Sequence, residues 1–204
     1  MYAAPAMQRH GNLGQVSKEE LRRALTRARR ARPAKREEDA ALAAQCLRLL
    51  SRCSPGPVAA YHPLPSEPGH STLLPALRGT GRDIYLPISL PGGRLAWALD
   101  GPSRPGHMGI PEPVGPRRGT EALASCALVL VPTLGISPEG YRLGKGGGYY
   151  DRALAALTAL APPRPPVAAL AYPEEIIPVP VEPHDQAVDY IVEPGGWRAK
   201  SKGA

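Results

Sequence analysis

Residues 142–151 (RLGKGGGYYD) combine four glycines with two cations, two tyrosines and an acid, the residue types of an anion-binding loop. The glycines leave backbone N–H groups free to approach an anion closely, because no Cβ stands in the way. A helix predicted to start near Tyr149 adds the positive end of its dipole. Arg142 and Lys145 bring full positive charges to the same place. Phosphate is the ligand that this combination favours.

Common nucleotide-binding patterns do not describe this loop. It is not a Walker A sequence, because the Gly-Lys pair is followed by Gly146 rather than by Ser or Thr. It is not a dinucleotide GxGxxG either, because position 149 is Tyr. On glycine content alone the run could be a flexible connector, but its charges and aromatics favour a binding site. We therefore expect an enzyme that uses ATP on a small substrate.

Two acids could hold a metal ion on such phosphates. Asp151 stands at the start of the predicted helix, where it could either complement the helix dipole or bind Mg²⁺, directly or through water. Asp185, in the proline-bounded run VPVEPHDQAVDYIV, could supply a second ligand if that run folds over the same strand ends. We interpret the neighbouring His184 as structural.

The elements that must position these residues alternate between short apolar runs and helical segments, which predicts an α/β sheet with crossover helices. The loop follows an apolar run at 126–131, expected to be a central buried strand, so it lies where ligands bind in open α/β sheets. Ser17 and Glu20 form a predicted capping box. Further strands are expected at 58–62, 83–88, 94–99, 167–171 and 188–192, helices at 17–33, 34–54, 71–78 and 149–161, and a long loop at 101–119.

The 204 residues suit one domain, with 26 Pro and 22 Gly in its loops and no Phe in its core. Three cysteines without a CxxC spacing argue against disulfides and against a zinc site, so we expect reduced thiols. Apolar runs of signal-peptide or membrane-spanning length are absent from the sequence, and we expect a soluble, cytoplasmic protein without a membrane partner. We expect a disordered leader at 1–16, one catalytic domain at 17–196, and a basic tail at 197–204.

The net charge of +7 is concentrated near the N-terminus, where residues 17–37 hold nine Lys or Arg against three Glu. This segment has no interleaved aromatic residues on which bases could stack, so no nucleic-acid partner is expected. We interpret the segment as a solvated helix face. An anionic small-molecule subsite on part of it is the alternative.

The run VPTLGISPEGYRLGKGGGYYDRAL, residues 131–154, closely resembles the signature of the 5-formyltetrahydrofolate cyclo-ligase family. The resemblance extends over nearly all of residues 18–192. It includes KEELR at 18–22, AAYHPLPSEPGHSTLLPAL at 59–77, IYLP at 84–87, MGIPEP at 108–113 and VPVEPHD at 179–185. Two segments depart from the family pattern: residues 68–72 after Glu67, and Leu134-Gly135-Ile136, where relatives often have an aromatic residue.

The resemblance implies a single three-layer α/β/α domain with a mixed, largely parallel sheet, monomeric or weakly self-associating. It also implies ATP- and Mg²⁺-dependent conversion of 5-formyltetrahydrofolate to 5,10-methenyltetrahydrofolate, with release of ADP and phosphate. A formamide oxygen is a poor leaving group, so the γ-phosphoryl is transferred to it before the second folate nitrogen closes the ring. Such a transfer needs positioning and charge neutralisation more than a protein nucleophile.

The same resemblance implies roles for individual residues. It assigns catalysis to Arg142, Lys145 and Tyr149, the substrate to Glu67 and Tyr150, and the metal to Asp151 and Asp185. ATP would be held by Lys18, Arg22, Arg142, Leu143, Gly144, Lys145, Gly146, Gly147, Gly148, Tyr149 and Tyr150.

Two alternatives remain open at the level of sequence. One is a catalytically silent relative that binds folate or nucleic acid through the basic helix and acts as a regulator. The other is a ligase or kinase for a different small substrate, because the ATP half of the site is better marked than the folate half.

Overall fold

A seven-stranded sheet forms the centre of the protein, in the order β11-β10-β9-β6-β1-β2-β3. This computed structural model describes residues 17–33, 35–160 and 163–201, so the expected leader at 1–16 lies outside the described residues. Strands β10, β9, β6, β1 and β2 are mutually parallel, and β11 and β3 pair antiparallel at the two edges. The strands are β1 (Val58–Ala59), β2 (Ile84–Leu90), β3 (Arg94–Leu99), β6 (Leu128–Val131), β9 (Val167–Leu170), β10 (Tyr190–Glu193) and β11 (Gly196–Ala199).

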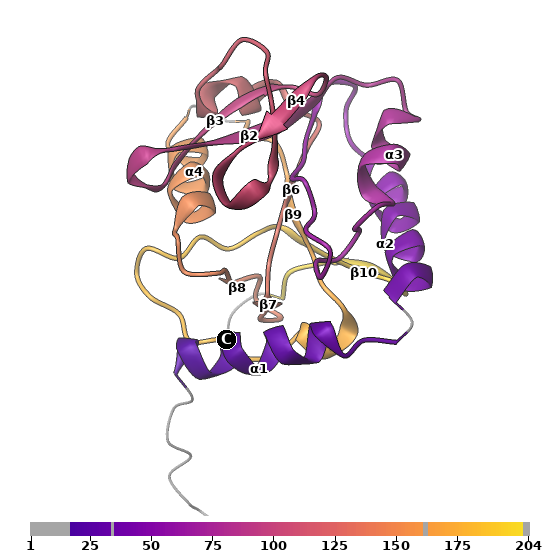
Figure 1. Ribbon diagram of the computed structural model, residues 1–204, viewed down its shortest axis with the longest axis vertical. Coiled ribbons are helices and arrows are strands. Elements are labelled where there is room, and N and C mark those ends of the chain that lie inside the picture. Colours follow the sequence, from indigo (N-terminus) through magenta and orange to yellow (C-terminus); the bar gives the residue numbers. More distant parts are fainter. Residues whose placement is uncertain (1–16, 34, 161–162, 202–204) are drawn as a thin grey trace, which may run out of the picture.

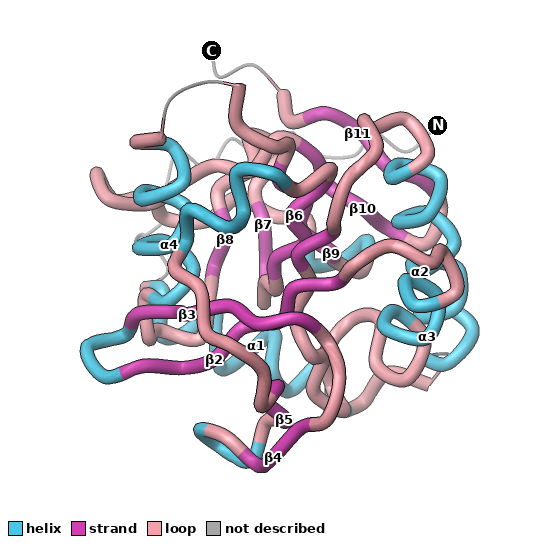
Figure 2. The backbone as a smooth tube through the Cα atoms, turned by 90° about the horizontal axis from the view of Figure 1, so that it is seen from above, coloured by secondary structure: helices cyan, strands magenta, loops and turns pink. Residues whose placement is uncertain are grey.

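Helices cover both faces of this sheet, which confirms the expected three-layer α/β/α fold with a mixed, largely parallel sheet (Figure 1). Side chains alternate along β6, so Leu128 and Leu130 face one layer while Val129 and Val131 face the other. The first layer holds α2 (Lys35–Leu50) and α3 (Leu73–Arg78), and the second holds α4 (Tyr149–Thr158) and the 3₁₀ helix η3 (Thr120–Ser125). Figure 2 shows α2 and α3 side by side, with α4 on the opposite side of the sheet.

Helix α1 (Lys18–Arg30) belongs to neither layer. It lies across the end of the sheet from which β7 (Gly135–Ile136) and β8 (Arg142–Leu143) extend (Figure 1). Its first turn carries the predicted capping box, in which Ser17 and Glu20 bond reciprocally. Leu25 packs with Leu134 and Leu143 in a small separate cluster. That cluster seats α1 over the strand ends.

Several elements differ from the sequence-based expectations. Helix α2 ends at Leu50 rather than 54, because Arg52 and Cys53 turn in 3₁₀ fashion ahead of Pro55. Strand β1 has only two residues instead of five. The segment 197–204, expected to be a tail, begins inside β11, which pairs with β10 and sets Trp197 edge-on to Tyr190 at a centroid distance of 5.5 Å.

The proline-rich segment 101–119 was expected to lack structure, yet it holds a hairpin. Strands β4 (Ser103–Pro105) and β5 (Pro111–Pro113) pair antiparallel around the 3₁₀ turn η2 (His107–Gly109). Figure 2 shows this hairpin beside β2 and on the far side of it from α4. The prolines hid the strands, because proline normally argues against a strand interior. Two more 3₁₀ turns are η1 (Pro91–Gly93) and η4 (Pro173–Glu175).

The core contains mainly aliphatic side chains, as the absence of Phe predicted, with Trp97 and Tyr172 as its largest buried members. The three cysteines are free thiols. Within the described ranges, no helix combines the length and apolar character that crossing a membrane requires.

Candidate functional site

A cavity of about 730 Å³ opens at the carboxyl ends of β1 and β6, between α1, the β4–β5 hairpin and the start of α4. All the residues that the sequence assigned to a site line this ligand cavity. They are Lys18, Arg22, Glu67, Arg142, Leu143, Gly144, Lys145, Gly146, Gly147, Gly148, Tyr149, Tyr150, Asp151 and Asp185.

The glycine loop, residues 144–148, connects β8 to α4 in a conformation that only glycines adopt readily. Gly146 and Gly148 have positive φ angles of 99° and 64°, in the left-handed range that penalises a Cβ. Gly148 is the N-cap of α4, and none of the described side chains caps this end. The N–H groups of the first turn therefore remain available to an anion.

Arg142 is a buried cation, only 6% exposed, at the floor of the ligand cavity. Its Nη2 donates to Asp151 Oδ1 at 2.6 Å, whereas its buried Nε has no hydrogen-bond partner among the described residues. Burial lowers the pKa of Arg142, and the adjacent Asp151 carboxylate opposes that shift. A buried donor without an acceptor is costly, and an oxyanion in the cavity could satisfy it.

Helix α1 brings two further cations to the ligand cavity. Lys18 Nζ lies 2.8 Å from Asp185 Oδ2 and 3.2 Å from Glu182 Oε1. Burial disfavours the charged ammonium, but the bonds to Asp185 and Glu182 outweigh it and hold the pKa of Lys18 above 10.5. Arg22 Nε donates to the carbonyl of Gly144 at 2.9 Å, which ties α1 to the glycine loop.

The acid expected to contact substrate faces the glycine loop from the other side. Glu67 is 6% exposed, and its Oε2 accepts from the backbone N–H of Leu64 at 2.8 Å. Its Oε1 lies 2.8 Å from Nζ of Lys145. Three cations expected to bind phosphate thus each pair with an acid expected to bind metal or substrate. Entry of an anionic ligand would exchange these partners instead of burying new unpaired charge.

Aromatic side chains form one wall of the cavity. Tyr150 meets Trp97 edge-on at a centroid distance of 6.4 Å, and Tyr149 lies at 6.4 Å from the His107 ring. Burial raises the pKa of Tyr150, so its hydroxyl stays protonated. The family resemblance implied that an aromatic residue often found in relatives is missing at 134–136. Leu134, which stands there, packs against α1. Trp97, from β3, supplies aromatic surface behind Tyr150.

The two acids expected to bind metal both line the cavity, although each is paired with a cation. Across the described part of the chain, no three His, Cys, Asp or Glu side chains gather into a metal cluster. Mg²⁺ commonly takes one or two carboxylates and completes its octahedron with water and substrate phosphates. Asp151 and Asp185 fit a metal that enters with a nucleotide.

Other cavity residues were not among the predicted site residues. Thr133 and Leu134 follow β6, so the rule that ligands bind at carboxyl ends of strands could have pointed to them. Glu112 and His107 come from the β4–β5 hairpin; the family resemblance included Glu112, within residues 108–113, but it predicted no strands there. Glu112 is buried, and its Oε1 accepts from the N–H of Ser89 at 2.9 Å, which attaches the hairpin to β2.

Comparison with known proteins gives a consistent result. The sequence profile of the 5-formyltetrahydrofolate cyclo-ligase family matches residues 14–194. The chain is 34% identical over 192 residues to a 5-formyltetrahydrofolate cyclo-ligase of Mycolicibacterium smegmatis, covering 87% of this chain and 94% of that protein. A 66-residue stretch is 41% identical to the 5-formyltetrahydrofolate cyclo-ligase of Mus musculus, covering 32% of each chain.

Two solved structures are similar in fold. The 5,10-methenyltetrahydrofolate synthetase of Aquifex aeolicus superposes with a TM-score of 0.70 at 25% identity, covering 92% of this chain and 94% of that one. The 5,10-methenyltetrahydrofolate synthetase of Mycoplasma pneumoniae gives a TM-score of 0.67 at 21% identity, covering 87% and 98%.

Proposed function

The chain belongs to the 5-formyltetrahydrofolate cyclo-ligase family, and we propose that it converts 5-formyltetrahydrofolate to 5,10-methenyltetrahydrofolate with ATP and Mg²⁺. The single observation that carries the proposal is the composition of the ligand cavity. A cationic glycine loop and a buried acid face each other across it, with Lys145 Nζ 2.8 Å from Glu67 Oε1. Such a cavity suits two ligands that must react with one another.

The phosphate end of the cavity is the glycine loop with its surrounding cations. Arg142 offers an Nε that has no partner among the described residues, and Lys145 offers a half-exposed ammonium. The first turn of α4, which no described side chain caps, offers N–H groups. Lys18 and Arg22 approach from α1. These donors suit the triphosphate of ATP, whose charge needs several fixed cations and amides. Asp151 and Asp185 would hold Mg²⁺, which would neutralise charge on the transferring phosphoryl group.

The folate end is the acid and aromatic part of the cavity. A carboxylate such as Glu67 can accept two hydrogen bonds from adjacent N–H groups of a pterin ring. Tyr150, backed by Trp97, would pack against that ring or shape the space beside it. The protonated phenol adds a hydrogen-bond donor.

In the proposed reaction the formyl oxygen attacks the γ-phosphorus of ATP, and the bond to the β,γ-bridging oxygen breaks with loss of ADP. The second folate nitrogen then attacks the activated carbon and loses its proton, and the carbon–oxygen bond breaks with release of phosphate. Arg142, Lys145 and Tyr149 would hold the phosphoryl oxygens in line for the transfer. The chain supplies position and positive charge rather than a nucleophile.

Incubation with 5-formyltetrahydrofolate, ATP and Mg²⁺ tests the proposal. Methenyl product and ADP should form in equal amounts, and omission of either substrate should stop both. Asp151→Asn should lower turnover strongly, because the neutral amide is a poor metal ligand and removes the negative charge that faces Arg142. ADP release no greater than background with the folate present would refute the function.

A further inference from the structure

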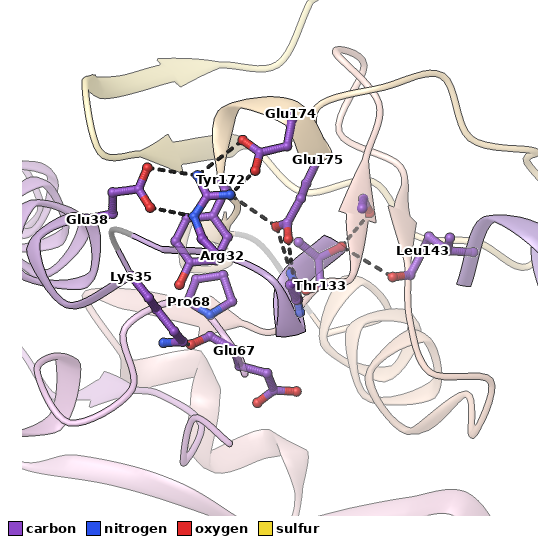
Figure 3. A network of polar contacts seen from close by, with 12 residues as sticks. Arg32, Lys35, Glu38, Glu67, Pro68, Thr133, Leu143, Tyr172, Glu174 and Glu175 are labelled. Carbon is purple, nitrogen blue, oxygen red and sulfur yellow. Dashed lines mark hydrogen bonds and ion pairs between the residues drawn. The ribbon is translucent and has the colours of Figure 1, made fainter. Parts of the chain in front are cut away.

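The segment that carries Glu67 is held at three consecutive backbone positions. Lys35 Nζ donates to the carbonyl of Glu67 at 2.9 Å, and the Tyr61 hydroxyl donates to the carbonyl of Pro68 at 3.0 Å. The N–H of Gly69 donates to Asp39 Oδ1 at 2.8 Å. Figure 3 shows Lys35 reaching the backbone between Glu67 and Pro68. These three contacts fix the backbone on which the Glu67 side chain is mounted.

The conformation needs such support. Gly69 has a φ of 80°, and a Cβ there would lie 3.0 Å from Cβ of Leu73. Ser71 has a φ of 63°, the one positive φ among the described residues other than glycine. A left-handed residue with a side chain is unfavourable and persists only where surrounding contacts determine the backbone.

Asp39, on α2, connects these contacts. It is 2% exposed and forms an ion pair with Lys35, one turn earlier on the same helix. Its Oδ1 accepts from Tyr172 at 2.6 Å as well as from Gly69, and its carbonyl accepts from Thr72 Oγ1 at 2.8 Å. Tyr172 follows β9, so Asp39 joins α2, the end of a central strand and the Glu67 segment.

The Tyr172 end of this network is itself fixed. The Arg32 guanidinium lies 3.8 Å from the ring centroid of Tyr172 and also bonds Glu38 and Glu174, as Figure 3 shows. Burial, followed by the bond to Asp39, raises the pKa of Tyr172, so the phenol remains a donor. Asp39 therefore has a rigid partner on the sheet side.

We propose that Asp39 is a positioning residue for the substrate: through Gly69 and Lys35 it fixes the backbone that aims the Glu67 carboxylate into the ligand cavity. Asp39 lies outside the set of described residues that line the cavity, so it acts on the ligand only through Glu67. The proposal rests on the proposed function in one respect, that Glu67 binds the folate. It predicts that loss of Asp39 raises the KM for the folate and leaves the KM for ATP nearly unchanged.

Separate KM measurements for 5-formyltetrahydrofolate and ATP test this. Asp39→Ala should raise the folate KM at least about tenfold, because a displacement of about 1 Å at a binding group has effects of this size or larger. The ATP KM should stay within about twofold. Asp39→Asn should restore most of the folate KM, because the amide oxygen can still accept from Gly69 and Tyr172. Lys35→Met, which keeps the aliphatic stem, should raise the folate KM by a smaller factor.

Asp189→Asn is the matched control. Asp189 is a partly buried carboxylate that, like Asp39, pairs with a cation and a backbone N–H, but it lies at the amino-terminal ends of β9 and β10, opposite the cavity. If Asp39→Ala lowers kcat only in proportion to a loss of folded protein, as a structural residue would, the inference is refuted. When Asp39→Ala does not fold, a folate KM unchanged in Lys35→Met refutes the inference instead.

Two further readouts separate this inference from the proposed function. In a Glu67→Gln background, Asp39→Ala should add little to the folate KM, because the two substitutions act on one group. Exchange of the Gly69 amide hydrogen, followed by NMR without any ligand, should be at least about tenfold faster in Asp39→Ala or Lys35→Met than in Asp189→Asn. Equal Gly69 exchange in all the variants would refute the positioning role, even if the enzyme is active. If exchange is faster in Asp39→Ala and Lys35→Met but the wild type has no cyclo-ligase activity, the result would count only against the proposed function.

Discussion

Replacement of Arg142 by lysine should lower kcat/KM for ATP about 10- to 100-fold while leaving the fold intact. The Arg142 guanidinium has two groups of donors with different surroundings in the cavity. Its Nη2 holds Asp151 at 2.6 Å, and its Nε is a buried donor without a described partner. A lysine ammonium keeps the charge but cannot present two donors in that fixed plane, so one contact is lost.

The magnitude follows from that single contact. A hydrogen bond between charged groups contributes about 1.5–3 kcal/mol, and about 1.4 kcal/mol corresponds to a factor of ten. Arg142→Met, which removes the charge and leaves Asp151 without its partner, should cost more than Arg142→Lys. Arg198→Met is the matched control, because Arg198, on the edge strand β11, pairs with Glu193 of β10 away from the cavity.

The assay is steady-state ADP release with ATP varied at saturating folate, alongside thermal unfolding of each variant. Arg142→Lys should unfold within a few degrees of the wild type, and Arg198→Met should match the wild type in both measurements. A kcat/KM for ATP within twofold of wild type in Arg142→Lys would show that Arg142 serves only to hold Asp151.

Three further predictions concern stability and reactivity. Arg29→Met should lower the free energy of unfolding in urea by about 3–5 kcal/mol, because it leaves the buried Glu175 carboxylate without the Arg29 bonds at 2.5 and 2.7 Å. The double variant Arg29→Met/Glu175→Met should recover part of this loss. A decrease of less than about 1 kcal/mol in Arg29→Met would contradict the argument. Burial raises the pKa of Asp189, but the bonds from Arg164 and the Val167 N–H outweigh it and hold the pKa below 3.8. The stabilisation is therefore present above pH 3.8 and fades as the pH falls through the lower folded value, so the gap in unfolding free energy between wild type and Asp189→Asn should be full at pH 6 and close below pH 3.8. Iodoacetamide at pH 8 should label Cys53 before the other two cysteines, because burial raises the pKa of Cys46 and Cys126 to about 12 while Cys53 is only half-buried. Mass spectrometry measures the labelling of each cysteine. Equal labelling of all three in the folded protein would contradict this prediction.

Local features were predictable because their causes lie within a few residues. The capping box at Ser17 and Glu20, the helix that begins at Tyr149 and the strand over residues 94–99 all follow from neighbouring side chains and backbone preferences. The all-apolar run before the glycine loop became the buried central strand β6, because only a strand covered on both faces tolerates such a run.

Long-range contacts and proline-rich segments were harder to predict. The β4–β5 hairpin and β11 were missed because their strands are short and contain Pro or Gly, so their pairing depends on a partner strand rather than on local propensity. The contact of Trp97 with Tyr150 could not be predicted either, because it joins β3 to the start of α4, two elements that lie far apart in the sequence.

The sequence by itself determined the chemistry of the cavity: which cations, acids, glycines and tyrosines are available, and that a glycine-rich loop with cations suits phosphate. The tertiary structure decided how those groups are paired. Lys18 meets Asp185 across 167 residues, and Lys145 meets Glu67. Residue types specify what a side chain can bind, but only the packing of α1 and α2 against the strand ends sets which opposite charge lies within reach, because Coulomb and hydrogen-bond energies depend on separations of a few ångströms.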